Sequence, residues 1–69
     1  MNILKINGVE KQFPDSLPQT LTELLKQLNV DSQTIVAEID GQIIKQNNFE
    51  KTKLKAGQNI ELVRFVPGG

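Results

Sequence analysis

The chain has 69 residues, and its eight basic and eight acidic side chains cancel to a formal net charge of zero. It contains no cysteine and no histidine, which excludes disulfides, thiolate metal sites and catalysis by a nucleophile paired with histidine. The charges are interspersed and the only aromatic residues are three Phe, so we expect no nucleic-acid partner. We find no stretch as long as a membrane span and no signal peptide pattern, so we expect one domain over residues 1–69, cytoplasmic and without a membrane partner.

Residues 2–13 have the pattern of a β-hairpin. Asn7-Gly8 supplies the two positive φ angles that a two-residue type I′ turn needs. The register that this turn sets places four apolar side chains on one face of the hairpin, namely Leu4, Ile6, Val9 and Phe13.

A helix is predicted after the proline-containing connection at residues 14–18. Thr20 and Glu23 have the spacing of a capping box, and Asn29 can take the left-handed conformation that ends a helix. Between them the apolar residues recur at helical spacing, as Leu21, Leu24, Leu25 and Leu28. We assign this stripe to the core, because a domain this small needs the helix to cover its sheet.

The second half of the chain predicts a strand pair, an irregular crossing and a last strand. Residues 35–39 and 42–45 flank a second type I′ turn signal, Asp40-Gly41. The crossing, residues 46–55, has no clear period, and we expect two apolar residues within it, Phe49 and Leu54, to anchor it as a loop or a single helical turn.

The order of these elements predicts an α+β roll with a mixed sheet of four or five strands and one main helix packed on one face. Because the helix separates the first hairpin from the second strand pair, the last strand, residues 60–66, can pair in the middle and unite them. The chain therefore ends directly after a strand that we expect at the centre of the sheet.

The last three residues, Pro67, Gly68 and Gly69, are predicted to form a flexible tail that threads into the active site of a partner. Pro67 lacks the N–H that a ladder requires, and the two glycines carry no side chain. The carboxylate of Gly69 is ionised at neutral pH and is a poor electrophile, so a partner must activate it, most simply as an acyl-adenylate. We take Gly69 as the working group, and we expect no catalytic side chain and no metal site.

Alternation along the last strand predicts a docking surface beside this tail. Val63 and Phe65 point away from the helix, and Val36 and Glu38 do the same on the neighbouring strand. A cluster of exposed apolar side chains next to a projecting tail indicates a surface for a partner.

Over its whole length the chain resembles the ThiS family, the small sulfur carriers of thiamine thiazole biosynthesis with the ubiquitin-like β-grasp fold. Five segments carry the resemblance: Met1–Gly8, Thr20–Leu28, Val36–Ile44, Gly57–Val66 and the terminal Gly68-Gly69. The chain departs from the usual family pattern at four positions, Gln46, Phe49, Gln58 and Pro67. The joint order of the segments, the compact length and the Gly-Gly end make the resemblance specific.

The resemblance implies a set of partners and no bound cofactor. A ThiF-like adenylyltransferase would use ATP and magnesium to convert the Gly69 carboxylate to an acyl-adenylate. A persulfide made by a cysteine desulfurase would then supply sulfur, giving a thiocarboxylate. A ThiG-like thiazole synthase would accept that sulfur, so the chain itself would be a protein co-substrate and not an enzyme.

Several other functions remain compatible with the sequence. The same chemistry could serve another pathway, as in the MoaD-type carriers of molybdopterin synthesis. The domain could also be a ubiquitin-like modifier that forms isopeptide bonds, or a passive β-grasp interaction module. An enzyme is disfavoured because the acidic residues fall at turns and outward strand positions without paired spacing.

Overall fold

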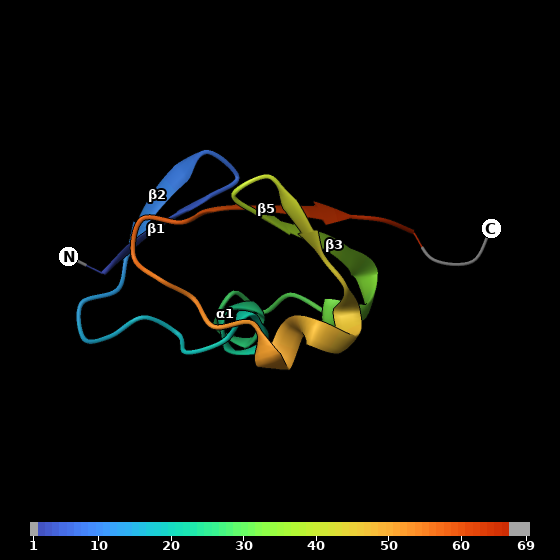
Figure 1. Ribbon diagram of the computed structural model, residues 1–69, viewed down its shortest axis with the longest axis horizontal. Coiled ribbons are helices and arrows are strands. Elements are labelled where there is room, and N and C mark those ends of the chain that lie inside the picture. Colours follow the sequence, from blue (N-terminus) through green and yellow to red (C-terminus); the bar gives the residue numbers. More distant parts are fainter. Residues whose placement is uncertain (1, 67–69) are drawn as a thin grey trace.

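The computed structural model describes residues 2–66, which form a five-stranded mixed sheet with one main helix (Figure 1). The strand order is β2-β1-β5-β3-β4, so the last strand lies at the centre of the sheet, as predicted. The elements are β1 (Ile3–Ile6), β2 (Val9–Gln12), α1 (Leu21–Gln27), the 3-10 turn η1 (Ser32–Thr34), β3 (Ile35–Ile39), β4 (Gln42–Ile44), the 3-10 turn η2 (Gln46–Lys51) and β5 (Asn59–Arg64). The predicted α+β roll is confirmed.

Both predicted tight turns are present. Asn7 and Gly8 have φ angles of 51° and 82°, and Asp40 and Gly41 have φ angles of 50° and 88°. Two successive positive φ angles are what a type I′ turn requires. The first turn gives the predicted register between β1 and β2, and β5 then pairs parallel with β1 and antiparallel with β3.

The N-terminus of α1 has the predicted cap, with one difference. The Thr20 hydroxyl oxygen accepts a hydrogen bond from the backbone N–H of Glu23 at 3.3 Å. The Glu23 carboxylate reaches back one residue further than a capping box places it, and it accepts from the N–H of Gln19 at 2.8 Å. Asn29, at φ 59°, follows the helix as expected.

The core lies between the sheet and α1, and η2 is on the same side as the helix (Figure 1). Phe49 and Leu54 are buried, which confirms them as anchors of the irregular crossing. Val9 is the register partner of Ile6 on the predicted apolar face, but its side chain is 68% exposed, because β2 is an edge strand with no buried residue. The buried apolar residues are Leu4, Phe13, Leu21, Leu24, Leu25, Ile35, Ala37, Ile39, Phe49, Leu54 and Ile60.

Strand β5 is shorter than predicted, since it ends at Arg64 and not at Val66. Its neighbour β3 begins at Ile35, which pairs with Arg64, and the residue before Ile35 belongs to η1. The ladder therefore loses its partner strand at this point. One further backbone bond follows, from the N–H of Phe65 to the carbonyl oxygen of Thr34 at 2.8 Å.

Candidate functional site

The three predicted tail residues, Pro67, Gly68 and Gly69, lie outside the described residues. The base of the tail is described. Among residues 2–66, the last backbone hydrogen bond joins the N–H of Phe65 to Thr34, and the side chain of Val66 is 91% exposed. The segment that leads to the predicted working group thus leaves the sheet at Phe65.

Strand β5 is held by two turn side chains in addition to its ladder bonds. The Asn7 side chain pairs with the backbone of Leu62: its Oδ1 accepts from the Leu62 N–H at 2.7 Å, and its Nδ2 donates to the Leu62 carbonyl at 3.2 Å. At the other end of β5, the Asp40 carboxylate accepts from the N–H of Asn59 at 2.9 Å. The two type I′ turns therefore bond to the strand that precedes the tail at two points, Leu62 within β5 and Asn59 at its start.

Our sequence analysis did not identify these two contacts, although it identified both turns. Asn and Asp are favoured in such turns because they tolerate positive φ and have short polar side chains that bond to nearby backbone. Here the bonded backbone belongs to β5, which is 55 residues away from Asn7 in the sequence at Leu62. A contact between residues so far apart in the sequence depends on the strand order, so the turn sequence alone does not predict it.

The predicted docking residues lie together on the face of the sheet that points away from α1. Val36 and Val63 are register partners, and both are exposed. Phe65 is two residues further along β5 and is 39% exposed. Glu38 is half-buried on the same face, two residues along β3 from Val36.

One apolar residue of this surface was missed. Ile43 on β4 is 68% exposed and is the register partner of Glu38. Together with Val36 and Phe65 it lines an open depression of about 440 Å³. Alternation from the half-buried Ile44 could have identified it. We refer to Val36, Glu38, Ile43, Val63 and Phe65 as the open-face patch.

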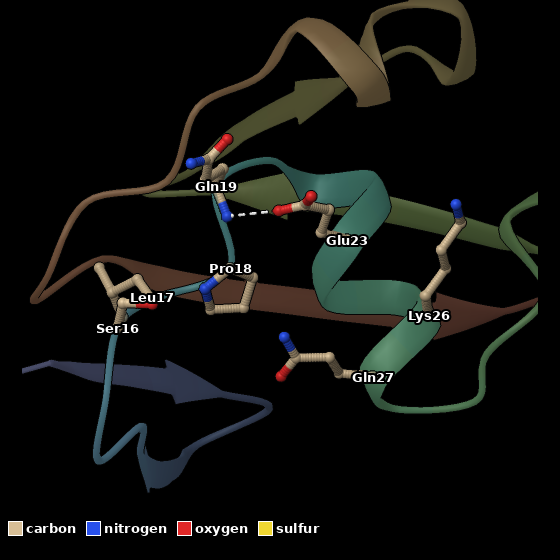
Figure 2. Close-up of a pocket in the computed structure, with 7 residues that line it drawn as sticks. All are labelled: Ser16, Leu17, Pro18, Gln19, Glu23, Lys26 and Gln27. Carbon is tan, nitrogen blue, oxygen red and sulfur yellow. Dashed lines mark hydrogen bonds between the residues drawn. The ribbon is translucent and has the colours of Figure 1, made fainter.

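A second depression, of about 490 Å³, lies on the helix side of the molecule between residues 16–19 and α1 (Figure 2). Figure 2 shows the Glu23 carboxylate turned toward the backbone nitrogen of Gln19, with which it forms the capping bond described above. The Glu23 carboxylate thus already accepts a hydrogen bond that caps the helix. The depression is also on the opposite side of the sheet from the open-face patch.

Within residues 2–66, no group of three or more acidic side chains is placed to hold a metal ion. In the same part of the chain, no helix has the length and apolar character needed to cross a membrane.

The fold and the patch together define a β-grasp protein with an uncovered sheet face beside its C-terminal segment. Residues 3–69 match the model of the ThiS family. The chain therefore belongs to the ThiS family.

Solved structures agree with this assignment. The crystal structure of the thiamine biosynthesis protein ThiS from Geobacter metallireducens matches with a TM-score of 0.84 and 28% identity, covering 97% of this chain and 99% of that one. A solution structure of a thiamine biosynthesis protein from the same organism matches with a TM-score of 0.78 and 30% identity, covering 100% and 88% of the two chains.

The chain is also similar to part of a longer protein. A thiazole synthase of Paramagnetospirillum magneticum is 33% identical over 66 residues, which are 96% of this chain and 20% of the relative. The chain thus spans about a fifth of the length of that relative.

Proposed function

We propose that this protein carries sulfur as a thiocarboxylate at Gly69 and donates it to thiazole formation in thiamine biosynthesis. The observation that carries the proposal is the ThiS family match, which runs through residue 69 and so includes the Gly68-Gly69 pair. The position of β5 supports it, because this central strand of the sheet ends at Arg64, a few residues before the pair in the sequence. The absence of Cys and His from the chain is consistent with sulfur carried on the backbone terminus.

The chemistry proceeds in two stages, both on partner enzymes. A ThiF-like adenylyltransferase, using ATP and magnesium, joins the Gly69 carboxylate to AMP and releases pyrophosphate. The terminal sulfur of a persulfide, made by a cysteine desulfurase, then attacks the carbonyl carbon and displaces AMP. A second thiol attacks the sulfur–sulfur bond, which releases the thiocarboxylate and leaves a disulfide. The chain is a co-substrate in this scheme and not an enzyme.

In this proposal the open-face patch docks the adenylyltransferase while the tail enters its active site. The four residues after Phe65, Val66 and the three of the tail, span at most about 14 Å when extended. A partner that holds the terminal carboxylate must therefore also cover the sheet end where Phe65 lies. The exposed apolar side chains there suit such a contact, since clusters of this kind mark docking surfaces.

A ThiG-like thiazole synthase is the proposed acceptor of the sulfur. The similarity to a segment of a protein named thiazole synthase supports this partner. A chain that contains both a ThiS-like segment and a synthase activity keeps donor and acceptor at a high effective concentration.

The experiment is mass spectrometry of the intact protein after incubation with the adenylyltransferase, ATP, magnesium and a sulfur source. We expect a population heavier by the difference between one sulfur and one oxygen atom, with the change mapped to Gly69. A variant with one extra residue after Gly69 is the matched control, and it should stay folded and unmodified. Protein that keeps its original mass under these conditions would refute the carrier function. Conjugates to lysines of other proteins would instead indicate a modifier.

A further inference from the structure

Two glutamates of the open sheet face lie directly opposite each other. Glu38 on β3 and Glu61 on β5 are register partners in the antiparallel pair. Both point away from α1, since the residues that flank them along the strands, such as Ala37 and Ile60, are buried beneath the helix. Like charges that are directly opposite across strands destabilise a sheet. The chain therefore keeps a contact that costs it stability.

Two lysines of this face lie near the pair, but neither is directly opposite one of its members. Lys5 is opposite Glu10 on β2 and Asn59 on β5, which places it diagonal to Glu61. The register partner of Glu38 on β4 is the apolar Ile43, and Lys45, two residues further on, is diagonal to Glu38. The next row of β3 and β5 toward the tail is apolar.

That apolar row joins the acidic pair to the base of the tail. Val36 and Val63 form the next outward pair along β3 and β5, and Phe65 follows, at the residue where the chain leaves the sheet. Along β5 the acidic pair, the apolar pair and the tail are thus contiguous on one uncovered face. A partner that holds the terminus through the four residues after Phe65 covers this face as well.

We propose that Glu38 and Glu61 receive an arginine guanidinium of the adenylating enzyme, with apolar side chains of that enzyme on Val36, Val63 and Phe65. This inference rests on the proposed function and specifies the chemistry of its docking partner. A guanidinium fits because it is planar, has five donors and is weakly hydrated, so it can bond two carboxylates while an apolar contact surrounds it. The charge of the partner offsets the repulsion at the pair itself, where the two lysines of the free protein are only diagonal neighbours.

The test compares three single variants, Glu38→Gln, Glu61→Gln and Glu10→Gln. Glutamine keeps the shape and removes the charge, and Glu10 is an exposed acidic residue of the β2 edge outside the pair. For each variant we would measure the urea midpoint of unfolding and the KM for adenylation of the carrier by the ThiF-type enzyme, at low and high salt.

The two glutamates of the pair should give opposite changes in the two measurements. Removing either charge relieves the repulsion and raises the urea midpoint, whereas it weakens docking by about tenfold at low salt, the loss of one hydrogen bond to a charged group. The difference from wild type should shrink at high salt because the interaction is screened. Glu10→Gln should leave KM unchanged.

The outcomes separate this inference from the proposed function. If the wild-type protein is adenylated and both pair variants have the KM of Glu10→Gln, the arginine contact is refuted while the carrier function stands. If KM rises and the urea midpoint falls in the same variants, the glutamates act on the fold and the inference is again refuted. A wild-type protein that is not adenylated would refute the carrier function, and this inference with it.

Discussion

Replacing Asn7 with glycine tests whether a turn side chain holds the strand that precedes the tail. Glycine retains the φ of 51° without strain and removes both bonds to Leu62. Each such bond contributes about 1 kcal/mol, and since both are at the surface, water can replace the lost partner. We expect a loss of about 1–2 kcal/mol, which lowers the Tm of a domain this small by roughly 5–15 °C.

The assay is thermal unfolding followed by circular dichroism, with hydrogen exchange of the Leu62 amide measured by NMR. Asp40→Gly is the matched control, because it retains a φ of 50° and removes one side-chain bond to β5 in place of two. Its loss should be about half as large, and it should leave the exchange of Leu62 nearly unchanged. Two results would show that the Asn7 side chain does not stabilise β5. One is a loss of stability for Asn7→Gly within the range of ordinary surface substitutions, about 0.5 kcal/mol. The other is an unchanged exchange rate of the Leu62 amide.

Three further substitutions test the core, the helix cap and the docking surface. Leu24→Ala removes a fully buried side chain and should cost about 2–5 kcal/mol, measured by urea unfolding; a smaller loss would mean that the site collapses around the smaller residue. Thr20→Ala removes the cap bond to Glu23 and should cost about 1 kcal/mol in the same assay, while Thr20→Ser should cost little. Phe65→Asp should abolish binding to the adenylyltransferase in calorimetry and change stability by less than about 1 kcal/mol, since the ring is partly exposed. Unfolding of that variant would instead show that Phe65 belongs to the core.

Local chemistry made much of this fold predictable. Asn7-Gly8 and Asp40-Gly41 specify their turns because few residue pairs accept two positive φ angles. The leucine stripe and Thr20 specify α1 because spacing and capping act within a single helix. The central place of β5 was also predicted, because a last strand in the middle can join the two strand pairs that the helix separates.

The features that were not predicted depend on what lies beside each residue in space. Val9 lies on the apolar face of the hairpin, but its side chain is exposed on the edge strand β2. Val66 has the pattern of a strand residue, but β3 offers no partner beyond Ile35. The pairing of Glu38 with Glu61 is a matter of register between strands 23 residues apart, which neither strand encodes alone.

The small size of α1 explains why one face of the sheet is exposed. A helix of seven residues is about 10 Å long, whereas five strands at their usual spacing make a sheet about 19 Å wide. One such helix with one 3-10 turn can cover the middle of one face, and nothing in residues 2–66 covers the other. The uncovered face is therefore a consequence of the short chain, and the residues placed on it can be selected for contact with partners. Apolar side chains near Phe65 and an acidic pair behind them are unfavourable on a face that remains in water, and this composition agrees with the proposal that a partner docks on this face.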